Sequence, residues 1–319
     1  MSTLFEKILL ATDGSEEAGS ATRIAAELCG KAGSELHLVY VGPHVAHVGD
    51  MGPVILDPTV AERAQERLNE ESEKFLAEQV QAVRDAEGTV TESYLRTKSP
   101  ADEIVRLAEE IDAGVIIMGS RGRGGVRRAL MGSVSEDVVL HAHCPVLVVR
   151  GEGGKPLFSD KVVLAIDGSE ESEAATDTAI DLVKRTGSEL YVVHAGFTAY
   201  LPYAHPYMAE NVESFAERAE KEAREFLENR VEQINEKINE QTKGQTNGQT
   251  EARVHTHLRR GDPKKEIVEL AEEVDAGLVI IGSRGLGGVR RALMGGVSDS
   301  VVRHAHCPVL VVRTEHDEA

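Results

Sequence analysis

The hydrophobic positions of the chain fall into short continuous runs, separated by longer segments that carry a polar face. Runs such as Val115–Met118 and Val146–Val149 are apolar throughout and rich in β-branched residues, which is typical of strands covered on both faces. The pattern predicts ten strands, at Lys7–Thr12, Glu35–Val41, Thr89–Arg96, Val115–Met118, Val146–Val149, Lys161–Ile166, Glu189–His194, Arg253–Arg259, Leu278–Ile281 and Val309–Val312. Four helices for every five strands indicate a doubly wound α/β unit with a parallel sheet and right-handed crossovers.

The chain contains this unit twice. The segment Lys7–Glu16 aligns with Lys161–Glu170 at an offset of 154, whereas the glycine-rich segments that begin at Gly119 and Gly282 align at an offset of 163. We assign the extra residues to a polar tract at about 241–250, QTKGQTNGQT, and expect it to be a flexible insert. The predicted organisation is a first domain at 1–150, a linker rich in Gly at 151–160 and a second domain at 161–319.

Several helix starts can be read directly from the sequence. Ser99 and Pro100 combine an N-cap residue with a proline at the first helical position, and Asp262 and Pro263 repeat the design. Ser15 and Ser169 are expected to cap the helices that follow the first strand of each domain.

Ligands of doubly wound sheets bind beyond the carboxyl ends of the strands. Asp13 and Asp167 stand there, at the end of the first strand of each domain. Their carboxylates are suited to accept hydrogen bonds from ribose hydroxyls or an adenine amine. The alternative is that Asp-Gly-Ser is only a good turn and cap.

The glycine-rich segment after the fourth strand is the more specific signal. Gly119 and Gly122 allow a ligand to approach the backbone, while Gly132 and Ser133 open the next helix with free N–H groups and a positive dipole end. Arg121 adds a charged donor. A loop that is glycine-rich only for packing is the alternative. Neither a P-loop nor the Gly-x-Gly-x-x-Gly dinucleotide fingerprint occurs in the chain.

The spacing Gly119-x2-Gly122-x9-Gly132-Ser133, followed by HAHCPVLVV from His141, resembles the universal stress protein family, whose ATP-binding members carry Gly-x2-Gly-x9-Gly-[Ser/Thr]. The resemblance covers nearly the whole chain as two tandem domains. It implies two Rossmann-like, five-stranded parallel sheets of order 3-2-1-4-5, ATP at the carboxyl edge with Mg or Mn bound through its phosphates, and a pseudo-dimer of the two domains that a further homodimer can extend.

The resemblance also implies the residues that surround the nucleotide. Asp13 and Val41 would frame the adenosine, and the loop glycines with Arg121, Ser133 and Ser135 would hold the ribose and phosphates. The predicted site in the first domain consists of Ala11, Thr12, Asp13, Val41, Met118, Gly119, Arg121, Gly122, Gly132, Ser133, Val134 and Ser135. The predicted site in the second domain consists of Ala165, Ile166, Asp167, Ala195, Ile281, Gly282, Arg284, Gly285, Gly295, Gly296, Val297 and Ser298.

The second copy departs from the motif at Gly296, where the pattern has Ser or Thr, and Ala195 takes the place of Val41. Loss of one hydroxyl hydrogen bond costs about 0.5–1.5 kcal/mol. The first site is therefore expected to bind ATP more tightly than the second. The segments 119–150 and 282–313 differ at only five of 32 positions, of which 133/296 is one, and this suggests that loop and terminal strand act as a unit.

The formal net charge of −19 disfavours binding to nucleic acid and to anionic lipid, although Arg123, Arg127 and Arg128 make a basic loop binder an alternative. No run approaches the ~18 apolar residues of a membrane span, and no signal-peptide layout opens the chain. We expect a cytoplasmic protein with three reduced cysteines.

The repeated His-Ala-His-Cys segments at His141 and His304 raise the alternative of a transition-metal site. When two His side chains are separated by one residue at the end of a helix, they point about 200° apart. No metal is therefore expected. A slow ATP hydrolase or nucleotidyl-transferring enzyme is the main alternative function, but the loop contains no His or carboxylate to serve as a base, and Glu136 and Asp137 lie beyond it. The sequence therefore predicts an ATP-binding stress-response or regulatory module with no assigned catalytic residue.

Overall fold

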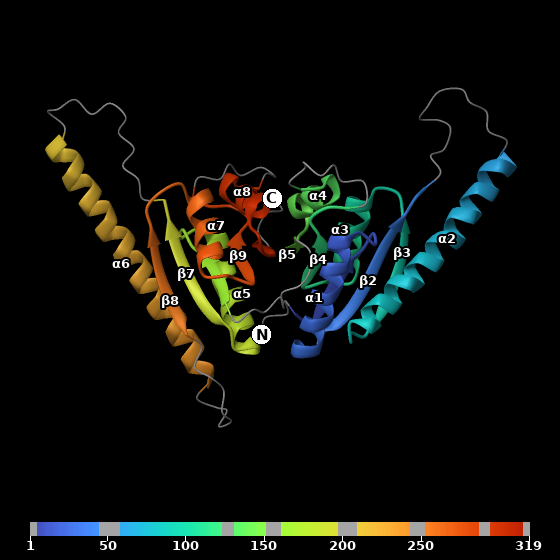
Figure 1. The fold of residues 1–319 in the computed structure, drawn as a ribbon, viewed down its shortest axis with the longest axis horizontal. Helices are drawn as coiled ribbons and strands as arrows, with labels where there is room; N and C mark the ends of the chain where they lie inside the picture. Colours follow the sequence, from blue (N-terminus) through green and yellow to red (C-terminus); the bar gives the residue numbers. More distant parts are fainter. Residues whose placement is uncertain are drawn as a thin grey trace. The chain divides into compact units, whose positions relative to one another are not determined.

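A computed structural model of the chain describes residues 5–44, 58–122, 131–150, 161–196, 209–242, 253–286 and 294–314. The chain divides into two compact units, with the division between Gly153 and Gly154. We call them the first and second unit and describe each by itself. In Figure 1 the first unit is coloured blue to green and the second yellow-green to red.

The first unit is a five-stranded parallel sheet with the order β3-β2-β1-β4-β5. Its elements are β1 (Lys7–Ala11), α1 (Glu16–Ala32), β2 (Glu35–Gly42), α2 (Pro58–Asp85), β3 (Glu92–Thr97), α3 (Pro100–Glu110), β4 (Val115–Gly119), α4 (Ser133–His141) and β5 (Val146–Val149). Each strand is joined to the next through a helix, and the order reverses between β1 and β4. That reversal is the place where doubly wound sheets form ligand clefts.

The second unit repeats the arrangement with the order β10-β9-β6-β7-β8. Its elements are β6 (Lys161–Ala165), α5 (Glu170–Thr186), β7 (Glu189–Ala195), α6 (Ala209–Thr242), β8 (Val254–Arg259), α7 (Pro263–Glu273), β9 (Leu278–Gly282), α8 (Gly296–His304) and β10 (Val309–Val312). The predicted fold class, two tandem doubly wound α/β units of order 3-2-1-4-5, is confirmed.

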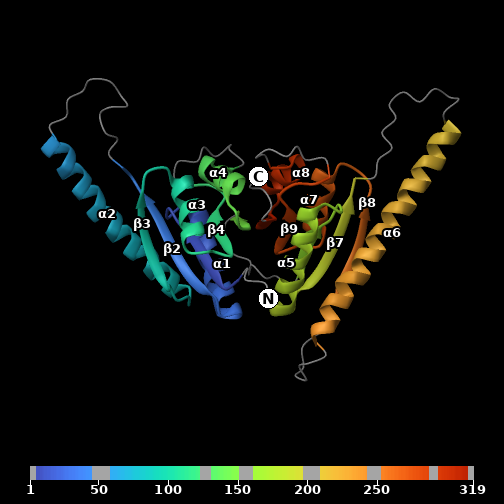
Figure 2. The ribbon, with the colours of Figure 1, turned by 180° about the vertical axis from the view of Figure 1, so that it is seen from behind.

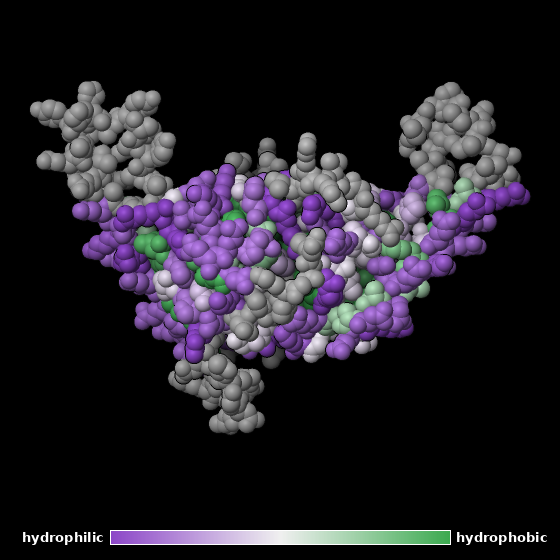
Figure 3. Space-filling model, in the orientation of Figure 1, coloured by the Kyte–Doolittle hydropathy of each residue, from purple (hydrophilic) through white to green (hydrophobic). Residues whose placement is uncertain are grey.

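The helices pack in pairs on the two faces of each sheet. In the first unit α1 contacts α2 and α3 contacts α4, and the second unit pairs α5 with α6 and α7 with α8. Figures 1 and 2 both show α2 lying alongside β2 and β3, and α6 alongside β7 and β8. The surface of α2 is largely hydrophilic, with a hydrophobic band on the side toward its sheet (Figure 3). Burial on both faces explains the uninterrupted apolar runs, since Ile8–Leu10 and Ile116–Ile117 are completely buried.

Each of the ten predicted strands is present, and its first and last residues lie within one residue of the expected positions, with one exception. The exception is β3, which begins at Glu92 rather than at Thr89. The N–H of Leu36 donates to the hydroxyl oxygen of Thr91 at 3.2 Å, so a side chain replaces the backbone acceptor at this point. The regular ladder with β2 starts only at the pair of His37 and Glu92.

The predicted helix starts are largely confirmed. The hydroxyl oxygens of Ser15 and Ser169 accept from N–H groups three residues on, at 3.2 and 3.3 Å, and Asp262 accepts from the N–H of Lys264 at 3.1 Å. Ser99 occupies the N-cap position of α3, but its side chain makes no capping hydrogen bond. The predicted N-cap position is therefore confirmed, and Pro100 and the acidic first turn stabilise the helix start in place of a side-chain cap.

The predicted linker at 151–160 lies outside the described residues, as does all of the predicted insert except its first two residues, which end α6 at Thr242. None of the helices in the described part of the chain is long and apolar enough to cross a membrane. Cys29, Cys144 and Cys307 are free and buried. Burial raises the pKa of Cys29 and of Cys144 to about 12, so these thiols stay protonated and unreactive at neutral pH.

Candidate functional site

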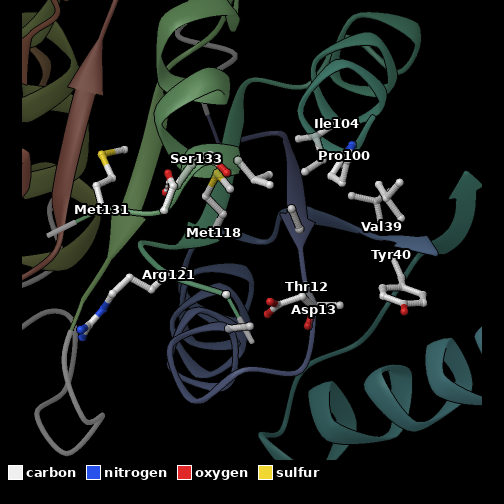
Figure 4. A pocket seen from close by; sticks show the side chains of 18 residues that line it. Thr12, Asp13, Val39, Tyr40, Pro100, Ile104, Met118, Arg121, Met131 and Ser133 are labelled. Atoms are coloured by element: carbon white, nitrogen blue, oxygen red, sulfur yellow. Dashed lines mark hydrogen bonds between the residues drawn. The ribbon is translucent and has the colours of Figure 1, made fainter. Parts of the chain in front are cut away.

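A cavity of about 570 Å³ opens at the carboxyl ends of β1, β2 and β4, at the reversal of strand order in the first unit. All twelve residues predicted for the first site line it, and we call it the first cavity. Six further residues line it as well: Ala18, Val39, Tyr40, Pro100, Ile104 and Met131. Figure 4 shows side chains of these lining residues, with Asp13 and Thr12 at the end of β1 and Ser133 at the start of α4.

The second unit has a cavity of about 410 Å³ at the corresponding place, which we call the second cavity. All twelve residues predicted for the second site line it, together with Ser172, Val193, Pro263, Lys264, Ile267 and Leu286. Both volumes fall in the range of about 300–1,000 Å³ that small-molecule sites occupy.

The aspartate at the end of the first strand holds the turn and also meets the glycine loop. In the first unit Asp13 Oδ1 accepts from the N–H of Ser15 at 3.0 Å, and in the second unit Asp167 Oδ1 accepts from the N–H of Ser169 at the same distance. The other oxygen, Oδ2 of Asp167, accepts from the N–H of Leu286 at 3.1 Å. The turn interpretation of these carboxylates is therefore correct for one oxygen of each.

The second glycine of each loop lies against that aspartate. A Cβ atom on Gly122 would lie 2.5 Å from Asp13 Oδ2, and one on Gly285 would lie 2.2 Å from Asp167 Oδ2. Contacts under 3.0 Å force a shift of one partner. Glycine is therefore what lets the loop lie against the carboxylate.

The first glycine of each loop has a different reason. A Cβ on Gly119 would meet the backbone of α1 at 2.9 Å, and one on Gly282 would meet the backbone of α5 at 2.8 Å. These two glycines let the end of the fourth strand pack against the first helix. For them the packing interpretation is correct.

Arg121 is paired with a buried carboxylate rather than directed into the cavity. Glu17 is only 6% exposed and accepts from Arg121 Nε at 2.6 Å and from Ser120 Oγ. Figure 4 shows the Arg121 side chain directed away from Asp13 and Thr12. In the second unit Arg284 Nε lies 3.5 Å from Glu171 Oε1. In the arrangement observed, Arg121 contacts Glu17 of α1 and Arg284 contacts Glu171 of α5. Each arginine would have to leave its glutamate to contact a phosphate.

The two predicted serines of the α4 start differ in what they can offer. The hydroxyl of Ser135 is buried and donates to the carbonyl of Ser120 at 2.7 Å, and Ser298 donates in the same way to Gly282. Their protons therefore serve the loop and are not directed to a ligand. Ser133 is exposed on the first turn of α4, whose N-cap Gly132 makes no side-chain capping bond. The donors open to a ligand are the Ser133 hydroxyl and the first N–H groups of the helix.

The linings of the two cavities differ at several corresponding positions. Ile166 replaces Thr12, Ser172 replaces Ala18, Ala195 replaces Val41, Ile281 replaces Met118 and Gly296 replaces Ser133. Lys264 lines the second cavity and stands where the first unit has Ala101. The Thr12 hydroxyl donates to Gln79 Oε1 at 3.1 Å and so ties α2 to the wall of the first cavity, a hydrogen bond that isoleucine cannot make.

Five of the twelve lining residues that the sequence did not predict come from α3 and α7. They are Pro100, Ile104, Pro263, Lys264 and Ile267. Their prolines were recognised as helix starts, and the sheet order would have placed those starts beside β1 and β6.

No group of three or more His, Cys, Asp and Glu side chains is arranged to hold a metal ion in the part of the chain that the structure describes. The Nδ1 atoms of His141 and His304 lie 2.8 and 2.7 Å from the carbonyls of Asp137 and Ser300 on their own helices. The candidate loop arginines Arg123, Arg127 and Arg128 lie outside the described residues.

Comparison with known proteins gives a consistent result. Residues 4–150 and 159–313 each match the model of the Universal stress protein family. A universal stress protein of Mycolicibacterium smegmatis is 29% identical over 311 residues, 96% of each chain. Universal stress protein Rv2005c of Mycobacterium tuberculosis is 31% identical over 263 residues, 76% of this chain and 77% of the relative. The crystal structure of a universal stress protein from Archaeoglobus fulgidus covers 97% of this chain and 98% of its own, with a TM-score of 0.67 at 24% identity, and shares the fold.

Proposed function

The chain belongs to the universal stress protein family, and on this premise we propose that its two cavities bind adenine nucleotides, with ATP as the ligand. The observation that carries the proposal is the convergence of three features in one cavity: an apolar wall, a carboxylate at the end of the first strand and the open N-terminus of the fourth helix. These features match the base, the sugar and the phosphates of a nucleotide.

The apolar wall of the first cavity suits a flat base. Val39, Val41, Ile104 and Met118 line it, and apolar side chains cover the faces of an aromatic ring without requiring hydrogen bonds. Asp13 stands at the edge of this wall with one carboxylate oxygen held by the Ser15 turn. Its other oxygen is the acceptor we assign to a ribose hydroxyl.

The start of α4 suits the phosphates. Helix N-termini bind anions because their first N–H groups have no partner within the helix and the dipole is positive there. Gly132 and Ser133 bring this end of α4 to the cavity, and Ser133 adds a hydroxyl. A Mg or Mn ion would be held through the phosphates in this proposal, since the described residues offer no metal cluster of their own.

We propose that the first site binds ATP more tightly than the second. The second cavity has no hydroxyl at Gly296, a smaller side chain at Ala195 and a volume of about 410 Å³ against about 570 Å³. Loss of this hydroxyl and the thinner wall reduce the affinity without removing the site, because the N–H groups of α8 remain.

The output of binding is proposed to be regulatory rather than catalytic, as a nucleotide-dependent module of the stress response in the cytoplasm. Among the described residues that line the two cavities, the acidic ones are Asp13 and Asp167, and none is a histidine. Both carboxylates hold their turns, so neither is placed as a free general base. A pairing of the two units, as the family resemblance implies, is part of the same proposal.

The direct test is to purify the full chain, denature it and identify any released nucleotide by mass spectrometry, followed by calorimetric titration with ATP and GTP. Bound adenine nucleotide, or ATP binding at two sites per chain, supports the proposal. Absence of nucleotide together with no binding of added ATP contradicts it.

A further inference from the structure

We propose that Lys264 makes the second cavity a phosphate-sensing site, which distinguishes ATP from AMP more strongly than the first cavity does. The inference rests on the proposed nucleotide function and assigns a ligand preference to one of its two sites. It starts from a residue that the family motif does not contain and whose counterpart in the first unit is the uncharged Ala101.

Lys264 stands at the second position of α7 and lines the second cavity. A Cβ atom on Gly296 would lie 3.8 Å from Lys264 Nζ and 3.9 Å from its Cε. The ammonium group therefore lies over the first residue of α8, where the Ser133 hydroxyl of the first site has its counterpart. The space left by the missing hydroxyl is bordered by a cation.

The first turn of α7 is basic where the first turn of α3 is acidic. At an offset of 163, Ala101-Asp102-Glu103 corresponds to Lys264-Lys265-Glu266. The formal charge is −2 in the first segment, from two acids, and +1 in the second, from two lysines and one acid. Of these six residues only Lys264 lines a cavity, so the second cavity has a cationic side chain at a place where the first has none.

The two lysines at the start of α7 have different surroundings. Lys265 Nζ pairs with Glu269 Oε1 at 3.1 Å along the outer face of α7. Across the described ranges, no carboxylate oxygen lies within 4.0 Å of Lys264 Nζ. Lys264 is the lysine available to a ligand, and Lys265 is its natural control.

The position of Lys264 is electrostatically unfavourable without an anion. A cation at the start of α7 opposes the dipole of its own helix, and its Nζ lies beside the start of α8, which is a second positive end. A polyphosphate placed between them relieves both repulsions. Because lysine acts as a point charge, this gain grows with the phosphate charge, so ATP benefits more than AMP.

Calorimetry on the full chain tests the proposal, with ATP and AMP as the probes. The first site is disabled by Gly122→Val, whose side chain would collide with Asp13, and Lys264→Gln or Lys265→Gln is added. Both lysines are exposed, so the folded state tolerates either change. We expect Lys264→Gln to weaken ATP binding about tenfold and AMP binding about threefold at most, and to reduce the salt dependence of the ATP affinity. Lys265→Gln should leave the ATP affinity, the AMP affinity and the salt dependence of the ATP affinity unchanged.

Equal ATP affinity with and without Lys264→Gln overturns the inference, as does an equal effect of Lys265→Gln. If the unmodified chain binds ATP at the first site and the Gly122→Val chain binds none, the inference fails while nucleotide binding at the first cavity stands. If ATP binds to neither site of the unmodified chain, the proposed function fails too.

Discussion

Gly122 lies so close to Asp13 that a Cβ atom at position 122 would be 2.5 Å from the aspartate Oδ2. The two residues are separated by more than a hundred positions and come from the ends of β4 and β1. Gly285 and Asp167 repeat the relationship in the second unit. In each unit this glycine therefore lies against the carboxylate that faces it, and both residues line the cavity.

Replacement of Gly122 by alanine should lower the free energy of unfolding by about 1–3 kcal/mol, because overpacking a close contact forces neighbouring atoms to move. Chemical denaturation followed by circular dichroism measures the change. Gly19→Ala is the matched control, since a Cβ on Gly19 in α1 meets nothing within 4 Å. Its helical propensity should raise stability by about 1 kcal/mol. Equal stability changes in the two variants would contradict the contact.

Exchange of the residues at the start of α4 and α8 should move affinity between the sites. Ser133→Gly removes a donor and should weaken ATP binding at the first site by about 0.5–1.5 kcal/mol. Gly296→Ser should tighten the second site by a similar amount, because the nearest atoms, at the end of the Lys264 side chain, leave ordinary van der Waals space. Calorimetry on each single variant and on the double variant checks this. A Gly296→Ser variant with unchanged affinity would show that the hydroxyl is not a ligand.

Glu17→Gln should lower stability and tighten ATP binding together. The substitution removes the carboxylate that holds Arg121 and Ser120, at a cost of about 1–3 kcal/mol for hydrogen bonds to a charged group. The freed guanidinium can then turn to a phosphate. Denaturation and ATP titration of the same preparation measure both effects. Glu171→Gln is the control, because the Arg284–Glu171 contact of 3.5 Å is longer. Loss of ATP affinity in Glu17→Gln would mean that the pair presents Arg121 to the ligand.

The buried thiols should make the protein less stable in alkali. Burial raises the pKa of Cys29 and Cys144 from 9.0 to about 12, so between these values the unfolded chain loses protons that the folded chain keeps. The stability from these groups is complete below pH 9 and decreases as the pH rises toward 12. Denaturant titrations from pH 8 to 10.5 should show this decrease, and Cys144→Ala should make it shallower. A pH slope that Cys144→Ala leaves unchanged would assign the effect to other groups.

Much of the fold follows from the sequence because burial on both faces leaves an unmistakable apolar run, as in Val115–Met118. The glycine loop and Asp13 could also be placed at one edge, since the carboxyl ends of parallel strands converge. The pairing of Arg121 with Glu17 could not, because it depends on which side of α1 faces β4. The inward hydrogen bond of Ser135 and the wall contributed by Ile104 and Lys264 depend likewise on side-chain direction. The spacing of residues in the sequence does not determine that direction.

The most direct test of the central claim, that each cavity holds a nucleotide, is the stoichiometry of ATP binding in three full-length proteins: the unmodified chain, Gly122→Val and Gly285→Val. The account predicts two ATP molecules per unmodified chain and one per variant, with Gly122→Val losing the tighter of the two sites. Circular dichroism confirms that each variant is folded. Unchanged stoichiometry in both folded variants, or no ATP bound by the unmodified chain, would contradict it.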